Sequence, residues 1–180
     1  MPATHRHLRL ALLHSAPDRA RRRGASAVGD ALARPLDGHD IVYLARNGSN
    51  VYMNTGYVVG ARVQAQVTSS GMLLLALSDP QWLDHWLAQQ PLKPYTSHTV
   101  TDPEVLRQQM ANIRMQRWCI SEQQLELDMR GIAVPLLDLH GDVVGALNVT
   151  MPIGKETPEN ALRRVLPVLQ ETARAMRNLI

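Results

Sequence analysis

The stretch Trp118–Met151, WCISEQQLELDMRGIAVPLLDLHGDVVGALNVTM, decides the fold of this chain. It contains two apolar runs, Gly131–Leu139 and Val143–Val149, which the turn sequence His140-Gly141-Asp142 separates. Short runs rich in Val, Ile and Leu on either side of a glycine-containing turn predict adjacent antiparallel strands. A polar segment that begins at Ser121 precedes them. The pattern indicates a sheet that offers a few polar groups to an apolar pocket, as in sites for small metabolites.

Length and composition predict one globular domain. The 180 residues, 45% of them hydrophobic and 19% charged, provide enough chain for a sizeable core. Phe is absent, so the core must be built from aliphatic side chains and Met. The single cysteine, Cys119, excludes a disulfide within the chain and fits a reducing cytoplasm. Because no apolar stretch is long enough to span a bilayer, we expect a cytoplasmic protein without a membrane partner.

The positive charge is confined to the start of the chain. Residues 1–23 hold six Arg and one Asp, so the remainder carries 13 Lys and Arg against 15 Asp and Glu. The body of the protein therefore lacks the basic surface that DNA-reading domains present. We interpret residues 1–30 as an Arg-rich leader or linker and residues 31–180 as the folded domain.

Outward from the central stretch, the sequence predicts a mixed α/β domain. Ile41–Arg46 and Val51–Thr55 have the pattern of strands, whereas Ala31–Pro35 is a poor strand candidate because Pro35 lacks an N–H donor. Gly56–Gln66 reads as a loop. Four helices are expected, over Ser69–Leu77, over Pro80–Gln89, from the Asp102-Pro103 start to about Arg117, and over Pro158–Leu179.

The sharpest candidate for chemistry is Thr68-Ser69-Ser70-Gly71, in which three hydroxyls lead into a helix. Unpaired N–H groups and the helix dipole favour an anion at such a place, so a small carboxylate would suit it. A plain helix start capped by Ser69 or Ser70 is the alternative that the residues leave open.

Catalytic and metal sites are not indicated. The seven His are scattered, and none has a second His at the helical i, i+4 spacing of a metal site. Cys119 lies in a strand-like run, where a buried, inert thiol is the usual state. No nucleophile elbow, phosphate loop or dinucleotide fingerprint is present, so we expect no catalytic residue, metal or cofactor.

Several motifs together resemble a known family. Arg130–Pro135, an acidic turn and Ala146–Thr150 are similar to the signature of the effector-binding domain of IclR-type bacterial transcription regulators. Matching segments precede it in the family's order, including Ile41–Arg46, Gly60–Val63 and Thr68–Gly71, so the resemblance covers roughly residues 36–180. It implies a GAF-like α+β fold with one antiparallel sheet flanked by helices. IclR-type regulators contact DNA through a winged helix-turn-helix, for which the upstream segment of this chain is too short.

The resemblance also implies a set of effector-contacting residues. It places them in the loop that leads into the helix Ser69–Leu77, just before the signature and on the paired strands: Ser69, Ser70, Ser121, Met129, Gly131, Asn148 and Thr150. Glu122 is added because the acid that IclR-type domains often have before the signature falls here, one place away from the mapped Ser121. Either residue could then face the pocket. Asn148 and Thr150 are two apart, so they share one face of a strand. Gly131 stands where several relatives have a larger residue, which is expected to leave more room.

The segment Cys119–Glu126 is most similar to the branch that regulates protocatechuate and 4-hydroxybenzoate catabolism. We therefore expect a small organic acid, preferably aromatic, as the effector, and a homodimer or homotetramer as the assembly. Two alternatives remain. One is a small-molecule enzyme on the same scaffold, since fold does not fix function. The other is an oligomerisation module whose vestigial pocket is filled by Met129 and Leu side chains.

Overall fold

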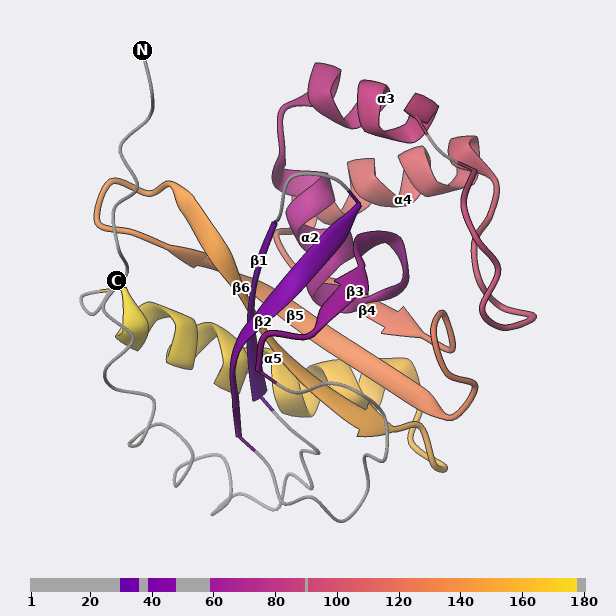
Figure 1. Ribbon diagram of the computed structural model, residues 1–180. Helices are drawn as coiled ribbons and strands as arrows, with labels where there is room; N and C mark the ends of the chain where they lie inside the picture. Colours follow the sequence, from indigo (N-terminus) through magenta and orange to yellow (C-terminus); the bar gives the residue numbers. More distant parts are fainter. Residues whose placement is uncertain (1–29, 36–38, 48–58, 90, 178–180) are drawn as a thin grey trace.

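The computed structural model describes residues 30–35, 39–47, 59–89 and 91–177. The elements follow in the order β1 Asp30–Pro35, β2 Asp40–Asn47, β3 Arg62–Gln64, the short 3-10 helix η1 Ala65–Val67, α2 Ser69–Leu77, α3 Pro80–Gln89, α4 Pro103–Gln116, β4 Cys119–Glu122, β5 Met129–Leu137, β6 Val143–Pro152 and α5 Pro158–Met176. The expected α+β domain, an antiparallel sheet flanked by helices, is confirmed (Figure 1).

The six strands form one sheet in the order β3-β2-β1-β6-β5-β4, and every neighbouring pair is antiparallel. The strand pair that the sequence predicted is β5 and β6, which lie next to each other and are joined by the turn at residues 138–142. An Asp138 side-chain oxygen accepts the N–H groups of His140 and Asp142 at 2.9 and 3.0 Å, which holds that turn. The register of β5 and β6 decides which side chains share a face of the sheet.

The two faces of the sheet carry side chains of different size. Every second residue in the middle of β5 and β6 points a large aliphatic side chain toward α5. These side chains form one core cluster with α5, including Ile132, Val134, Leu136, Leu147 and Val149. The opposite face offers the small residues Ala133 and Ala146, which belong to the cluster built around α2. This difference allows α2 to approach the sheet closely, whereas α5 packs against it over long side chains.

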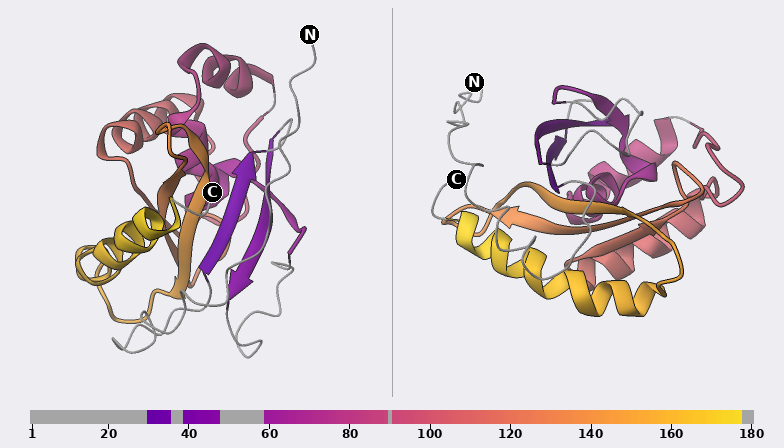
Figure 2. Two further views of the ribbon diagram at one scale, coloured as in Figure 1. Left: turned by 90° about the vertical axis from the view of Figure 1, so that its left-hand side faces the viewer. Right: turned by 90° about the horizontal axis from the view of Figure 1, so that it is seen from below.

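Helix α2 is the centre of the fold. Residues Ser69–Ala76 are all buried, as expected for a helix that is apolar on every side. It contacts β1, β2, β4, β5 and β6, and the sheet curls around it (Figure 2, right). Helix α4 packs beside α2, and its Arg114 donates to the carbonyls of Ala76 at 2.7 Å and Ser78 at 2.5 Å. These bonds satisfy carbonyl groups at the C-terminal end of α2 and fix its position.

Gly71 permits the tight packing at the start of α2. A Cβ atom at this position would lie 2.2 Å from the carbonyl oxygen of Ala65 in η1. That oxygen belongs to the main chain and cannot rotate away. Any larger residue at position 71 would therefore push α2 away from η1.

Helix α5 closes the other face of the sheet, as the sequence predicted from its apolar spacing. Its buried residues are Ala161, Val165, Leu169, Ala173 and Met176. The Thr157 hydroxyl accepts the N–H of Asn160 at 3.3 Å, and Pro158 occupies the first turn, where its missing N–H costs nothing. The predicted end at Leu179 falls outside the described residues.

Two predictions about the strands are wrong. Residues 30–35 do form a strand, because Pro35 is its last residue: pairing with β6 already ends at Ala33, and Pro35 is opposite only Ile41 of β2. The expected loop Gly56–Gln66 contains β3, which pairs with the first residues of β2, and the start of η1. The predicted strand Val51–Thr55 and the predicted leader 1–30, apart from Asp30, fall outside the described residues.

Candidate ligand-binding site

The first turn of α2 begins one residue earlier than its serines suggested. Thr68 is the N-cap: it has an extended backbone, and its hydroxyl accepts the N–H of Gly71 at 3.1 Å. The prediction that Ser69 or Ser70 caps the helix is therefore wrong, because both are already helical. As a result the two serine hydroxyls are free of the capping role, and they lie in the turn where helix N–H groups lack intrahelical acceptors.

Ser69 is in direct contact with the sheet. A Cβ atom built on Gly131 of β5 would lie 2.5 Å from Ser69 Oγ and 3.0 Å from Ser69 Cβ. The room beside Gly131 is thus taken by Ser69, and the expectation that this glycine leaves extra space for a ligand is wrong. Gly131 instead allows the start of α2 to lie against β5.

Six of the candidate residues share the α2 side of the fold. Ser121, Gly131 and Thr150 are opposite one another across β4, β5 and β6, so they form one row on a single face. Met129 lies two residues before Gly131 on β5, and Asn148 lies two residues before Thr150 on β6, so both point to the same face as the row. Because the two strands are antiparallel, Met129 and Asn148 stand on opposite sides of the row. Ser69 stands over the row through its contact with Gly131.

Asn148 is buried without a full set of hydrogen bonds. Its side chain is 2% exposed, and Nδ2 donates to Thr150 Oγ1 at 3.1 Å. Its Oδ1 atom has no partner, and neither does Oγ of the fully buried Ser70. Turning the amide would exchange its oxygen and nitrogen but would still leave one polar atom unpartnered. An unsatisfied buried group costs about 1–3 kcal/mol, so both positions are expected to have a purpose other than packing.

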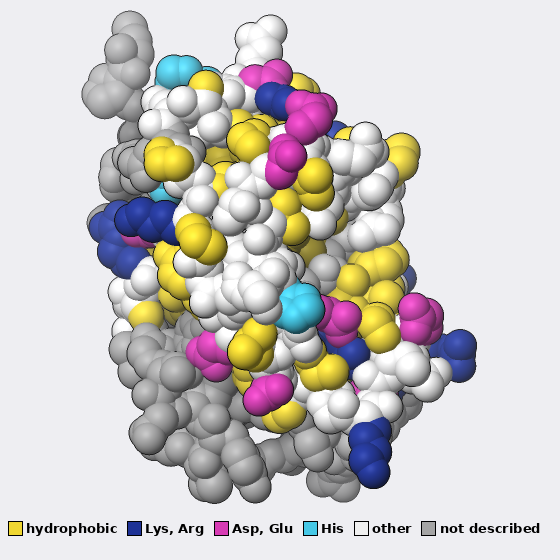
Figure 3. Space-filling model, turned by 90° about the vertical axis from the view of Figure 1, so that its right-hand side faces the viewer, with side chains coloured by type: hydrophobic (Ala, Val, Ile, Leu, Met, Phe, Trp, Pro, Cys, Tyr) yellow, Lys and Arg dark blue, Asp and Glu magenta, His cyan; other side chains and the backbone are white. Residues whose placement is uncertain are grey.

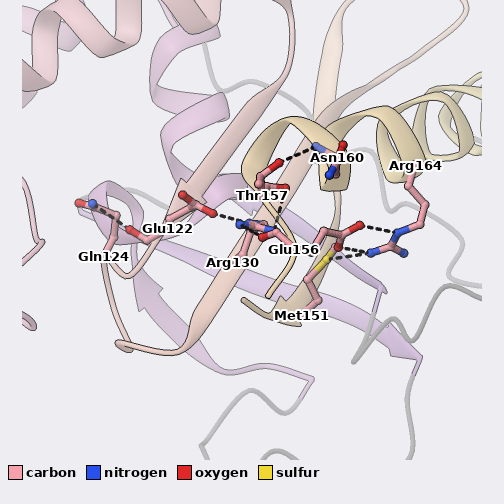
Figure 4. A network of polar contacts seen from close by, with 8 residues as sticks. All are labelled: Glu122, Gln124, Arg130, Met151, Glu156, Thr157, Asn160 and Arg164. Atoms are coloured by element: carbon pink, nitrogen blue, oxygen red, sulfur yellow. Dashed lines mark hydrogen bonds and ion pairs between the residues drawn. The ribbon is translucent and has the colours of Figure 1, made fainter. Parts of the chain in front are cut away.

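Glu122 is separated from the other candidates because neighbouring residues of a strand point to opposite faces. Its carboxylate forms an ion pair with Nε of Arg130, its register partner on β5 (Figure 4). Arg130 is 1% exposed and also donates to the carbonyls of Glu156 at 2.9 Å and Thr157 at 3.5 Å. The structure therefore places Glu122 in a network that joins β4, β5 and the start of α5.

This network continues on the surface through Arg164, which donates to the two carboxylate oxygens of Glu156 at 3.0 and 2.6 Å. The hydrogen bond from Arg164, opposed by partial burial and helped by the charges of Arg164 and Arg130, lowers the pKa of Glu156. From the sequence, Arg130 was identified only as part of a family motif. Its position inside an apolar strand, followed by a glycine, was the available signal for a buried cation.

A second set of contacts borders the row at its β4 end. Thr96 and Thr99 hydroxyls donate to the carbonyls of Gln123 and Gln124 at 2.5 and 2.6 Å. The Gln124 side chain donates to the carbonyl of His98 at 2.8 Å and accepts the N–H of Val100 at 2.9 Å. The segment before α4 is thereby fastened to the chain that follows Ser121, which was not recognised from the sequence.

Within the described ranges, no group of three or more His, Cys, Asp or Glu side chains could hold a metal ion. No described helix is both long and apolar enough to cross a membrane. Cys119 of β4 is fully buried. It is opposite Ala133 of β5, which in turn is opposite Asn148 of β6. Burial raises the pKa of its thiol well above the usual range.

Curated relatives include regulators of aromatic acid metabolism. The Pca regulon regulatory protein of Pseudomonas putida is 39% identical over 77% of this chain and 48% of its own length. The p-hydroxybenzoate hydroxylase transcriptional activator of Acinetobacter baylyi is 32% identical over 81% of this chain and 55% of its own length. This chain thus spans about half the length of these relatives.

Solved structures with a similar fold include proteins in complex with hydroxybenzoates. The inducer-binding domain of PobR from Acinetobacter, a double mutant in complex with 3-hydroxybenzoic acid, superposes with a TM-score of 0.78 at 30% identity, over 85% of this chain and 89% of that one. An IclR homologue from Microbacterium hydrocarbonoxydans in complex with 4-hydroxybenzoate gives a TM-score of 0.76 at 26% identity, over 91% of this chain and 64% of that one.

The match to a family covers most of the chain. Residues 33–178 correspond to the family described as bacterial transcriptional regulator IclR C-terminal. The resemblance inferred from the sequence is confirmed: the chain belongs to the IclR family of bacterial transcription regulators and comprises its C-terminal, effector-binding domain.

Proposed function

We propose that this domain binds a hydroxylated aromatic carboxylic acid between the first turn of α2 and the α2-facing side of β4, β5 and β6. The observation that carries the proposal is the buried Asn148 amide, which has one polar atom without a partner. A ligand that brings a polar group to this atom gains a hydrogen bond whose protein partner is already desolvated. The Ser70 hydroxyl, also buried and unpartnered, offers a second such bond.

The two ends of the ligand would meet different chemistry. The N-terminal turn of α2 presents backbone N–H groups and the positive end of the helix dipole, which suit a carboxylate. The opposite wall offers Asn148 and Thr150, which are neutral groups suited to a phenolic hydroxyl. Relatives whose names or complexes involve 4-hydroxybenzoate and 3-hydroxybenzoic acid support this ligand class.

A calorimetric series on the intact chain tests the proposal. The ligands would be 4-hydroxybenzoate, 3-hydroxybenzoate and protocatechuate, with benzoate lacking the hydroxyl, 4-hydroxybenzamide lacking the charge, and pyruvate lacking the ring. We expect at least one hydroxybenzoate to bind about tenfold more tightly than benzoate and than 4-hydroxybenzamide, as one buried hydrogen bond would give. Equal affinity for benzoate, or binding of pyruvate alone, would contradict the proposed ligand.

The domain is also proposed to form a symmetric homodimer or homotetramer. The apolar face of helix α5 packs against the sheet of its own domain, so we propose a contact through other elements. Exposed apolar side chains instead include Trp82 of α3 and Val105 and Met115 of α4. Hydrophobic groups lie among polar and charged ones on this side of the molecule (Figure 3). Light scattering at several concentrations tests the assembly, and a monomer throughout would contradict it.

In a complete regulator the ligand would act through its different affinity for two interdomain or intersubunit arrangements. We place residues 31–180 in the ligand-responsive domain and assign DNA contact to a winged helix-turn-helix outside this chain. Such a regulator would work in the bacterial cytoplasm, where its DNA lies. Fusing this domain to the DNA-binding head of the Pseudomonas putida relative and assaying operator binding with and without ligand tests this coupling.

A further inference from the structure

A cavity of about 310 Å³ lies at the end of β5 that is remote from Gly131. Its apolar wall includes Val134, Pro135 and Leu137, and three arginines surround it: Arg117, Arg174 and Arg177. A strand rises about 3.3 Å per residue, so Pro135 and Leu137 stand roughly 13–20 Å along β5 from Gly131. This cavity is therefore separate from the proposed effector site.

The cavity exists because β4 is shorter than β5. Pairing between the two strands ends at Cys119 opposite Ala133, whereas β5 continues to Leu137. At Arg117 the chain adopts a left-handed conformation with φ of 62°, which ends α4 just before β4 begins. The last residues of β5 consequently have no strand neighbour on this side within the described sheet, and the C-terminal half of α5 forms the other wall.

The described side chains that line the cavity carry a net positive charge. Its lining contains three guanidinium groups and no carboxylate, and no ion pair is formed by these arginines among the described residues. Arg177 is held in place by donating to the carbonyls of Asp138 at 2.8 Å and Leu139 at 3.3 Å. The left panel of Figure 2 shows the side of the molecule where α5 ends, beside the hairpin of β5 and β6.

The other arginines whose side chains are described divide into two groups. Arg62, Arg107, Arg130 and Arg164 each pair with an Asp or Glu. Arg114 donates to two carbonyls and Arg163 to the Asn160 amide. The cavity is distinguished by bringing together three guanidinium groups that have no carboxylate partner among the described residues. Guanidinium groups bind carboxylate and phosphate through paired, charge-assisted hydrogen bonds, and several of them around an apolar wall fit an anion with an apolar body.

We propose that this cavity is a second ligand site, which takes a small organic anion carrying carboxylate or phosphate groups. Its volume lies at the lower end of the range of about 300–1,000 Å³ for small-molecule sites. The apolar part of the ligand rests on Val134, Pro135 and Leu137, and its charged groups meet Arg117 and Arg174. Arg177 completes the site and links it to the turn between β5 and β6. The proposal does not depend on the identity of the effector.

Methyl NMR of the full chain, labelled at Val, Leu and Ala, tests the site. The probes are isophthalate, which has two carboxylates on an apolar ring, its uncharged diamide, and inorganic phosphate, which has charge without an apolar body. We expect isophthalate to shift the methyl signals of Val134, Leu137 and Ala173 in a saturable way, with the diamide at least about tenfold weaker because it lacks the charge.

Matched substitutions on α5 decide the location. Arg174→Gln removes a guanidinium from the cavity, and Arg163→Gln makes the same change on an exposed part of the helix. We expect Arg174→Gln to weaken isophthalate binding about fivefold or more and Arg163→Gln to leave it unchanged. Equal effects of the two substitutions, or shifts confined to residues around Asn148, would overturn the site. Phosphate binding as tight as isophthalate would overturn the assignment of an organic ligand.

Discussion

Gly131 of β5 and Ser69 of α2 are packed so closely that a Cβ atom on residue 131 would lie 2.5 Å from Ser69 Oγ. This contact is where the first turn of the buried helix meets the row formed by Ser121, Gly131 and Thr150. The atom that stands in the way belongs to a short side chain, which can rotate, and not to the main chain. The distance between helix and sheet at the proposed effector site is therefore controlled by two small residues.

Gly131→Ala should displace the Ser69 side chain and shift the start of α2. We expect the free energy of unfolding to fall by about 1–3 kcal/mol, the usual cost of overpacking, and effector affinity to fall as well. Ser69→Ala in the same protein removes the obstructing oxygen and should recover part of the stability. Urea denaturation measures both effects.

Gly71→Ala provides the comparison, because the group it would strike is the Ala65 carbonyl at 2.2 Å. No side-chain deletion can relieve this clash, so we expect a larger loss of stability that Ser69→Ala does not recover. If Gly131→Ala proved as damaging as Gly71→Ala and equally resistant to rescue, the contact between Ser69 and Gly131 would not be the controlling one.

Arg130→Met should destabilise the domain without affecting effector affinity. The substitution removes the partner of Glu122 and three donated hydrogen bonds, yet the Glu122 side chain is 33% exposed and stays partly hydrated. We therefore expect a loss of about 1–3 kcal/mol, below the cost of stranding a fully buried charge. Arg163→Met on the surface of α5 is the control.

The double variant Glu122→Gln, Arg130→Met isolates the ion pair in a double-mutant cycle. We expect it to be less destabilised than the sum of the single changes. Calorimetry with the best hydroxybenzoate should give the same affinity for Arg130→Met and the natural chain. A tenfold loss of affinity would mean that Glu122 or Arg130 does contact the effector, contrary to the strand alternation seen here.

Cys119 is expected to be unreactive in the folded protein. Burial raises the pKa of its thiol, so the thiolate that attacks disulfide reagents is scarce as well as inaccessible. Because the folded pKa is raised above the unfolded one, the contribution of this thiol to stability is complete below the unfolded pKa and is lost as pH rises from there through the folded pKa. An aromatic disulfide reagent that releases a coloured thiolate should react with Cys119 only as fast as the protein unfolds. Fast reaction in native buffer would contradict the burial of the thiol.

The sequence predicted the centre of the fold because the signals there are local. Two apolar runs around a glycine turn specify β5 and β6, and α5 follows from its regular apolar spacing. Pro35 was misread because the rule against proline in strands does not apply at the end of pairing. The cap of α2 was misplaced because three hydroxyl residues in succession can each accept a helix N–H, and only backbone geometry selects Thr68.

The candidate site was predicted less completely, for a different reason. Strand alternation alone could have separated Ser121 from Glu122, since neighbours cannot face the same side. The contact between Ser69 and Gly131 and the grouping of Arg117, Arg174 and Arg177 join segments far apart in the chain. Such groupings depend on register and helix placement, which no local pattern contains. The list of effector-contacting residues stays a prediction.

The most direct test of the site is Asn148→Leu. The amide leaves one buried polar atom without a partner in the protein and forms a hydrogen bond to Thr150 Oγ1 at 3.1 Å. Leu has nearly the same volume and needs no partner, so we expect the free energy of unfolding to stay equal or to rise by up to about 1 kcal/mol. Affinity for the effector should fall about tenfold or more, as the loss of one or two buried hydrogen bonds implies. Denaturation and calorimetry together separate the two roles of Asn148. Lost stability with unchanged affinity would make Asn148 a structural residue and would move the effector away from β6.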